Sequence, residues 1–398
     1  MFEAADKEYR PAFHFSPAKN WMNDPNGLIW HKGEYHLFFQ YNPFGREWGH
    51  MSWGHAVSKD LLNWEELEVA IPEGKDGAIF SGSAVSLNDE IVAIYTRDKD
   101  QIQDQCIATS SDSGRTFKKY IDNPVLDLRM EHFRDPKVFR YNDKWIMVVV
   151  KSREFVVCIY ESEDLKSWTL LSEFGKVGAT GGQWECPDLF PLEINGEQVR
   201  VLIVSLSPGG IKNNSGTQYF IGNFDGRTFT PKYSTDEPRW LDYGSDNYAG
   251  VTFNNEPNNR RILIGWMNSW QQKEHAETSW TGAMTIPREL GLVDVNGEIE
   301  LTQTPVCEAT YTVEIPAAAS GEIGLNGFVR LGYDAQKKII FVNDFEAPYD
   351  AGNRAFKLLV VVDRTSVELF TEDGTRCITI AVFPPIGSSR ELIPFHTF

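Results

Sequence analysis

Hydrophobic and polar residues alternate along most of the chain in short runs, and Gly, Pro, Asn or Asp residues separate one run from the next. Alternation with a period of two residues is typical of β-strands that bury one face, and the longer period of amphipathic helices is scarce in this sequence. Many of the runs are also rich in Val, Ile, Phe, Tyr and Trp, which favour strands. The pattern therefore predicts an all-β protein.

The strand pattern repeats within residues 1–295. Four segments end a strand with a polar turn followed by an aromatic residue, at about 50 to 60 residues from one to the next. These aromatic residues are Trp64, Phe117, Trp168 and Phe229. Five strand–turn–strand segments interleave with them and begin near residues 26, 81, 136, 187 and 247. Such a recurring unit is typical of a β-propeller, and the series predicts five blades; a large sandwich with coincidental spacing is the alternative.

The rhythm of the strands changes after residue 305. Residues 306–398 contain runs such as KKIIFVND and AFKLLVVVD, joined by turns such as DAQK and EDGT. This pattern predicts an antiparallel β-sandwich, and residues 296–305 are expected to connect it to the propeller. Because no flexible Gly/Ser-rich or Pro-rich linker separates the two domains, we expect them to pack together.

The acidic composition excludes some classes of function. The net charge is −18 and no cluster of Lys and Arg is present, so we expect binding neither to nucleic acid nor to an anionic membrane surface. No window approaches the ~18 apolar residues of a membrane span. The 25 Phe, 14 Tyr and 12 Trp are enough to fill cores and also to offer flat faces to sugars.

The cysteines and the start of the chain bear on cofactors and localisation. The five cysteines are odd in number and lack metal-ligand spacing, so we expect free thiols, no metal and no organic cofactor. The first residues, MFEAADKEYR, lack the basic and apolar parts of a secretory signal. A cytoplasmic protein is expected from the sequence as written, and a secreted or periplasmic one if a signal peptide has been removed.

The stretch WMNDPNG combines a turn signal with candidate chemistry. Asp24, Pro25 and Gly27 occupy the first, second and fourth positions of a predicted tight turn. Asp24 could serve only to start the turn, or the turn could serve to hold Asp24.

Carboxylates gather at the starts of the predicted inner strands. Because the inner strands of a propeller line one channel, residues at their starts converge at one end of it. The residues at these positions are Asn23 and Asp24, Phe80 and Ser81, Arg134 and Asp135, Glu185 and Asp188, and Asp242 and Asp246. Like charges held together raise at least one pKa, so one carboxyl group keeps its proton while another stays ionised. Glycoside cleavage needs such a pair.

Each of these residues also has a structural interpretation. Asp24 and Asp135 precede Pro, and Asp-Pro commonly opens a turn. Asp188 is expected to accept hydrogen bonds from the backbone. Glu185 has no turn role, because it lies between the bulky Trp184 and Cys186. Three tryptophans could belong either to the core or to a sugar platform; they are Trp48, Trp53 and Trp266.

Several motifs, taken together and in this order, carry a family resemblance. They are WMNDPNG, FFQYNPF, WGHMSWGHAVSKDLLNW, FSGSAV, FRDPKVF, WECPDLF and GAMTIPREL. With them the chain, from about residue 9 to its end, resembles glycoside hydrolase family 32, the β-fructofuranosidases, which include invertases, inulinases and levanases. The resemblance implies a five-bladed propeller followed by a β-sandwich.

The resemblance also implies roles for individual residues. Asp24 would be the nucleophile, Glu185 the general acid/base, and Asp135 a transition-state stabiliser that orients the fructose hydroxyls. The implied fructose pocket consists of Asn23, Gln40, Trp48, Phe80, Ser81, Arg134 and Trp266. Asp242 is a looser match, expected on the aglycone side. The implied reaction is a double displacement that retains the anomeric configuration.

The expected function is an exo-β-fructosidase that acts on levan, inulin and sucrose. The phrases GGQWECPDLF, SGTQYF and GAMTIPREL favour exo-acting fructanases over sucrose-only invertases. A sucrose-preferring invertase, a fructosyltransferase and an inverting arabinan-type furanosidase are the alternatives, and the three intact carboxylates disfavour a non-catalytic sugar-binding propeller. The short C-terminal domain and the brief 73–83 segment leave substrate length and oligomeric state, monomer or homodimer, open.

Overall fold

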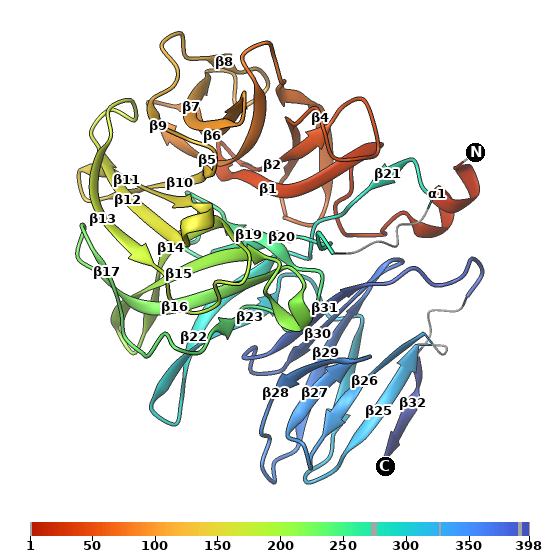
Figure 1. Cartoon of the computed structure of the whole chain (residues 1–398). Helices are drawn as coiled ribbons and strands as arrows, with labels where there is room; N and C mark the ends of the chain where they lie inside the picture. The colour runs from red at the N-terminus through yellow and green to blue at the C-terminus, as the bar shows by residue number, and fades with distance from the viewer. Residues whose placement is uncertain (1, 272–276, 326–327, 389–391, 398) are drawn as a thin grey trace.

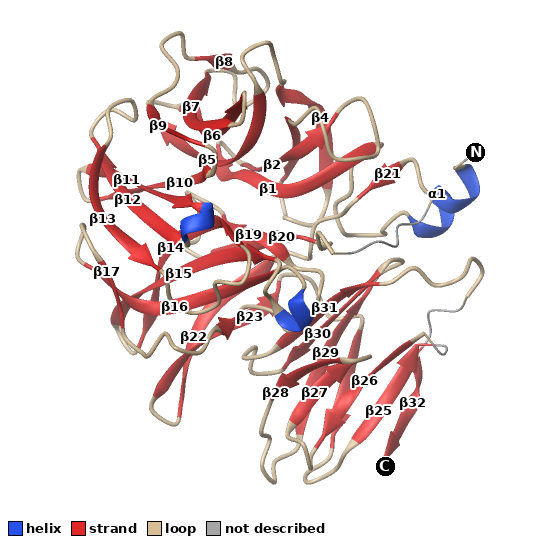
Figure 2. Ribbon diagram, in the orientation of Figure 1, coloured by secondary structure: helices blue, strands red, loops and turns tan. Residues whose placement is uncertain are grey.

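The computed structural model describes residues 2–271, 277–325, 328–388 and 392–397. Strands dominate these residues, which confirms the predicted all-β class (Figure 2). The helical segments of the described residues are α1 (Glu3–Tyr9) and two 3₁₀ turns, Ser152–Glu154 and Ile211–Asn213. None of the described helices is long and apolar enough to cross a membrane.

Residues 20–305 form successive sheets arranged around a common axis (Figure 1). The first sheet contains β1 (Asn20–His31), β2 (Glu34–Asn42), β3 (Ser52–Ser58) and β4 (Trp64–Ile71). The second contains β5 (Ala78–Leu87), β6 (Glu90–Lys99), β7 (Ile102–Ser110), β8 (Lys118–Lys119) and β9 (Leu126–Met130). The third contains β10 (Phe133–Tyr141), β11 (Lys144–Lys151), β12 (Val156–Ser162) and β13 (Thr169–Gly175). Strands are antiparallel within each of these sheets.

Two more sheets complete the propeller. The fourth contains β14 (Gln183–Ile194), β15 (Glu197–Ser207), β16 (Gly216–Phe224), β17 (Phe229–Pro231) and β18 (Arg239–Trp240). The fifth contains β19 (Tyr248–Thr252), β20 (Arg261–Trp266), β22 (Arg288–Val295) and β23 (Glu298–Pro305). The short strand β21 (Trp280–Thr281), between β20 and β22 in the chain, pairs in parallel with β1 and so ties the end of the ring to its beginning.

Apolar faces of neighbouring sheets pack against each other. Phe38 and Trp53 of the first sheet are fully buried with Tyr95 and Cys106 of the second. Because strand side chains alternate between the two faces, each sheet can present apolar residues to both of its neighbours. The sheets are thereby held in fixed positions, which places the starts of β1, β5, β10, β14 and β19 around one channel.

All five innermost strands are irregular at the same place. The pairing of each with its neighbour shifts between Met22 and Pro25, Ile79 and Gly82, Arg134 and Lys137, Glu185 and Asp188, or Tyr248 and Val251. Such a shift is a β-bulge, which bends the strand and re-aims its side chains. A bulge also tolerates proline, which cannot donate to the ladder; Pro136 and Pro187 each lie within one.

The tight turn predicted at residues 24–27 is wrong. β1 runs through these residues without a break and accommodates them with two pairing shifts. Gly27 is needed there, because its φ is +56° and a Cβ atom would lie 2.5 Å from Cδ2 of Phe38. The sequence signal of a turn therefore marks a bulged strand.

The described residues of 311–397 form the β-sandwich, which confirms the second part of the predicted fold (Figure 1). One sheet contains β24 (Tyr311–Ile315), β29 (Phe356–Val362), β30 (Ser366–Thr371) and β31 (Cys377–Ala381). The other contains β25 (Gly321–Leu325), β26 (Val329–Asp334), β27 (Ile339–Val342), β28 (Phe345–Pro348) and β32 (Leu392–Thr397). Residues 296–305, expected as a connector, instead contain β23, so the change from propeller to sandwich falls after Pro305.

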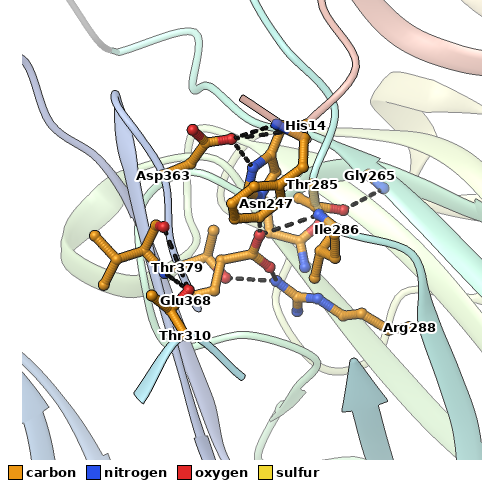
Figure 3. A network of polar contacts seen from close by, with 12 residues as sticks. His14, Asn247, Gly265, Thr285, Ile286, Arg288, Thr310, Asp363, Glu368 and Thr379 are labelled. Carbon is orange, nitrogen blue, oxygen red and sulfur yellow. Dashed lines mark hydrogen bonds and ion pairs between the residues drawn. The ribbon is translucent and has the colours of Figure 1, made fainter. Parts of the chain in front are cut away.

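A buried network of charges joins the two domains (Figure 3). Arg288 of the propeller donates to Glu368 of the sandwich at 2.5 Å, and both side chains are fully buried. His14 lies between two sandwich carboxylates, 2.8 Å from Asp363 and 2.7 Å from Glu368. Because buried charges are stable only when paired, these contacts fix the relative position of the domains.

Candidate active site

A cavity of about 450 Å³ opens at the end of the channel where the five bulges lie. Its walls come from all five sheets and their adjoining loops. The lining residues are Asn23, Asp24, Gln40, Trp48, Phe80, Ser81, Asp98, Gln103, His132, Arg134, Asp135, Gln183, Glu185 and Trp270. The structure thus brings together nine of the eleven residues that the sequence proposed for the site, and it places Asp242 and Trp266 elsewhere.

Asp24 is held by donors on both carboxylate oxygens. Ser81 Oγ donates to Oδ2 at 2.6 Å, and Asn23 Nδ2 donates to Oδ1 at 3.0 Å. The side-chain oxygen of Asn23 in turn accepts the indole N–H of Trp21 at 2.7 Å, which fixes the orientation of the amide. Burial and then the charge of Glu185 raise the pKa of Asp24, and the donors oppose this shift by stabilising the ionised form.

Asp135 lies at the bulge of β10 with a left-handed backbone, φ +67°. Its Oδ2 accepts the backbone N–H of Cys186 at 2.9 Å, and its own N–H donates to Thr96 Oγ1 at 2.8 Å. Burial, together with the charges of Glu185 and Asp24, raises the pKa of Asp135 to about 7 although Arg134 acts against it. The fourth sheet therefore holds the carboxyl group of Asp135, and the second sheet holds its backbone.

Glu185 is the least buried of the three carboxylates, with 21% of its side chain exposed. Its Oε1 accepts two hydrogen bonds from Arg134, at 2.9 Å from Nη2 and 3.2 Å from Nε. The hydroxyl of Tyr248, on the first residue of β19, donates to Oε2. Burial and the charge of Glu185 raise the pKa of this tyrosine well above its ordinary value, so it remains a donor.

Arg134 connects the third sheet to its neighbours. Besides Glu185, its guanidinium donates to Gln183 at 2.9 Å and to Gln103 at 3.3 Å, and Nε lies 3.9 Å from Asp135. Burial lowers the pKa of Arg134, but the charges of Glu185 and Asp135 outweigh burial and raise it. A permanent cation thus stands between two carboxylates and partly cancels their repulsion.

Aromatic and amide side chains form the remaining wall. Trp48 is 51% exposed and its ring lies 6.0 Å from that of Phe80 in an edge-on arrangement. Gln40 is buried, and its Nε2 has no hydrogen-bond partner among the residues that the structure describes. An unpaired buried amide is costly, so a ligand hydroxyl in the pocket would satisfy it.

Asp242 does not reach the pocket, which corrects the expectation that it contacts the aglycone side. Its carboxylate is buried at the domain interface, 2.9 Å from Arg288 and 2.6 Å from Thr379 Oγ1. The reason is the register of the fifth sheet. Its bulge follows Tyr248, so Tyr248 takes the place that Glu185 has in the fourth sheet, and Asp242 and Asp246 precede the strand.

Trp266, expected to line the fructose pocket, lies in the core instead. It is fully buried and packs in the core with Trp21 and Tyr248. Trp270, four residues later, is 39% exposed and lines the pocket instead. β20 ends at Trp266, and the chain then leaves the sheet and carries Trp270 over the pocket rim.

Other site residues escaped the sequence interpretation. Tyr248 and Cys186 contact the carboxylates, and four polar residues line the rim: Asp98, Gln103, His132 and Gln183. Gln183 and His132 lie two residues before Glu185 and Arg134, so the alternation of strand side chains could have placed them on the same face. Asp98 and Gln103 flank the β6–β7 turn, and nothing in their spacing points to the pocket.

The arrangement defines a class of protein. Two carboxyl groups in different surroundings, one buried and one partly exposed, stand in a sugar-sized pocket with a third carboxyl group beside them, as glycoside cleavage requires. Comparison with known families agrees. The N-terminal domain of glycosyl hydrolases family 32 matches residues 14–305, and the C-terminal domain of the same family matches residues 285–397.

Individual relatives support the same assignment. A levanase of Bacillus subtilis is 40% identical to this chain over 96% of the chain and 68% of the levanase. An extracellular exo-inulinase of Aspergillus niger is 36% identical over 95% of this chain and 90% of the inulinase. The crystal structure of exo-inulinase from Aspergillus awamori has a TM-score of 0.88 at 34% identity and covers 98% of this chain and 96% of that one. The structure of the fructofuranosidase from Schwanniomyces occidentalis complexed with fructose has a TM-score of 0.89 at 31% identity, and the match covers 98% of this chain and 95% of that one. The chain belongs to glycosyl hydrolase family 32 and is a glycoside hydrolase.

Proposed function

We propose that the protein is a retaining exo-β-fructosidase that releases terminal fructose from β-fructans and from sucrose. The observation that carries the proposal is the contrast between Asp24, buried and held by two donors, and Glu185, partly exposed and held by Arg134 and Tyr248. The relatives named levanase, exo-inulinase and invertase support the substrate class.

In the first displacement, an oxygen of ionised Asp24 attacks C2 of the terminal fructofuranosyl unit. The bond between C2 and the leaving oxygen breaks, and Glu185 transfers its proton to that oxygen. Asp24 ends in an ester with the sugar, and Glu185 ends as a carboxylate. The contacts of Ser81 and Asn23 favour the ionised state of Asp24 that this step needs.

In the second displacement, Glu185 takes a proton from a water molecule as the water oxygen attacks C2. The ester bond to Asp24 breaks and fructose leaves with its original anomeric configuration, because C2 has been inverted twice. Arg134 can hold the Glu185 carboxylate that the first step leaves and that acts as the base in the second. The role we propose for Asp135, whose Oδ2 accepts the backbone N–H of Cys186, is to hydrogen-bond the sugar hydroxyls.

The closed floor of the pocket supports exo-action. Beneath the pocket the channel narrows to a cavity of about 10 Å³. Asn254 fills the channel by donating to the carbonyls of Ala84 and Val138, and Lys137 pairs with Asp188 at 3.0 Å. A substrate chain therefore cannot thread through the channel, which supports a pocket that holds the unit at the end of a chain.

Two variants test the assignment of roles. Asp24→Ala and Glu185→Ala should each lose about 10³-fold or more of kcat on sucrose and inulin while still folding, as shown by a single cooperative thermal transition. On an aryl β-fructofuranoside, whose leaving group needs no proton, azide should rescue Glu185→Ala with formation of the β-fructosyl azide, whereas any azide product of Asp24→Ala should be the α-anomer. NMR of the first product should show β-fructofuranose; α-fructofuranose, or wild-type turnover in either variant, would refute the mechanism.

A further inference from the structure

A second cavity adjoins the catalytic pocket and shares Trp48 with it. It is a groove of about 1100 Å³, more than twice the volume of the pocket. One side consists of the segment 42–50, which we call the β2–β3 loop, and the other includes Thr281 of β21 and Ser279 just before it. Because Trp48 lines both cavities, a ligand that fills the pocket and extends past Trp48 would reach the groove.

The β2–β3 loop presents two aromatic rings to the groove. Phe44 is 75% exposed and Trp48 is 51% exposed, and both line the groove. A single exposed aromatic ring is common on protein surfaces and needs no explanation. Two of them four residues apart, on the wall of one groove that shares Trp48 with the catalytic pocket, form an apolar surface of the kind that binding sites use.

Hydrogen bonds hold the loop that carries these rings. Asn42 ties both halves together, because its Oδ1 accepts Phe44 N–H at 2.9 Å and its Nδ2 donates to the carbonyl of Glu47 at 2.8 Å. Three more loop carbonyls accept hydrogen bonds from outside the loop. They are Pro43 from Asn20 Nδ2 at 2.8 Å, Gly45 from Trp21 N–H at 2.9 Å and Arg46 from Thr281 Oγ1 at 3.0 Å.

The ring of Phe44 also has a fixed neighbour. It meets the ring of His50 edge-on, with centroids 5.3 Å apart and planes at 87°. His50 Nδ1 is 2.6 Å from Glu73 Oε1, which anchors the imidazole. Phe44 is therefore held by its loop and by His50 while most of its surface stays exposed. A preordered aromatic ring loses little conformational entropy when a ligand covers it.

We propose that this groove binds the sugar units that follow the terminal unit of a fructan chain, with Phe44 as a stacking platform. The inference rests on the proposed function and adds a preference for longer substrates. Sugar rings are uncharged and carry C–H groups on one face, so a flat aromatic ring can cover that face while hydroxyls bond to polar groups nearby. Asn20, Lys19 and Glu47 supply such groups along the groove.

Chain-length dependence of the kinetics tests this proposal. Phe44→Ser should lower kcat/KM by about five- to tenfold for inulin and for fructo-oligosaccharides of four or more units, through KM, and should leave sucrose within about twofold. Phe44→Trp should restore the wild-type values on the long substrates. Ile121→Ser, at a side chain that is 89% exposed and remote from the groove, is the matched control and should behave as wild type on every substrate.

The outcomes separate this proposal from the function on which it rests. If wild-type protein releases no fructose from any substrate, the proposed function fails. If wild type is active and Phe44→Ser keeps wild-type kcat/KM on the long substrates, or loses activity equally on sucrose, the groove proposal alone is refuted. Thermal unfolding of Phe44→Ser should match wild type, because the side chain is mostly exposed.

Discussion

The sulfur of Cys186 lies 3.5 Å from Asp24 Oδ2, so a residue of the fourth sheet contacts the candidate nucleophile on the first. The same sulfur lies 3.7 Å from Asp135 Oδ2. Burial, followed by the charges of the nearby carboxylates, raises the pKa of the thiol well above its ordinary value. Cys186 is therefore a neutral, weak donor between two carboxylates.

Removing this thiol should change the pH profile of the enzyme. Because the S–H contact lowers the pKa of Asp24, Cys186→Ala should shift the acid limb of kcat/KM upward by about half a pH unit and lower kcat several-fold. Cys158→Ala, at a buried cysteine of the third sheet, is the control and should keep the wild-type profile. Superimposable profiles for Cys186→Ala and wild type would contradict this role.

Ionised Asp135 should lower the free energy of unfolding of the protein. Its folded pKa of about 7 lies above the ordinary value of 3.8, so the folded protein holds this proton more tightly than the unfolded chain does. Stability from this group is then present below about pH 4 and is lost as pH rises through about 7. Asp135→Asn should unfold about 4 °C above wild type at pH 8 and at the same temperature at pH 4. The exposed Asp100→Asn should match wild type at both.

Trp270 and Trp266 should respond differently to truncation. Trp270→Ala removes part of the pocket wall and should raise KM for sucrose about tenfold with little change in thermal unfolding. Trp266→Ala leaves a core cavity and should cost about 3–5 kcal/mol of stability. Steady-state kinetics and thermal melts of both variants check this assignment. A raised KM for Trp266→Ala together with a loss of stability for Trp270→Ala would mean that Trp266, and not Trp270, lines the pocket.

The buried charges between the domains should be sensitive to the loss of one partner. Arg288→Met leaves Asp242 buried without its cation and leaves Glu368 paired with His14 alone, and it should destabilise the protein by about 3–5 kcal/mol. Arg330→Met breaks the exposed pair with Glu322 and should change stability by less than about 1 kcal/mol. Urea unfolding of both variants measures the difference; equal effects would mean that the interface does not depend on this network.

The contribution of His14 to the stability of the same interface should be lost at alkaline pH. Burial lowers the pKa of His14, but hydrogen bonds to Asp363 and Glu368 outweigh it and raise the pKa to about 9. Since this exceeds the ordinary value of 6.5, the stabilisation is complete below about pH 6.5 and is lost as pH rises through about 9. The gap in melting temperature between wild type and His14→Gln should shrink from pH 6 to pH 10. A gap that stays constant would show that His14 is not charged.

Much of the architecture could be predicted from the sequence because strand alternation and its recurrence are local signals. The starts of the inner strands of the first four sheets were also within reach, and they include Asp24, Asp135 and Glu185. Their convergence follows from the symmetry of a propeller, so the repeat alone brings them together.

The remaining errors concern register. Asp24-Pro25-Asn26-Gly27 has the composition of a turn, and only pairing with β2 makes it a bulged strand. In the fifth sheet Asp242 and Asp246 lie just before the first residue of the inner strand. A shift of a few positions along the chain determines whether a side chain points into the pocket or into the domain interface. The partners Arg288 and Glu368 are 80 residues apart, and no local pattern joins them.

All five inner strands carry a bulge at the same position, so each sheet holds one or two side chains at an equivalent place around the channel. Each blade offers the same kink at the same depth, and what a blade contributes depends on the one or two side chains that occupy it: an acid, an alcohol, a guanidinium or a phenol. New chemistry can therefore arise by exchanging an occupant, with the frame that aims it left intact.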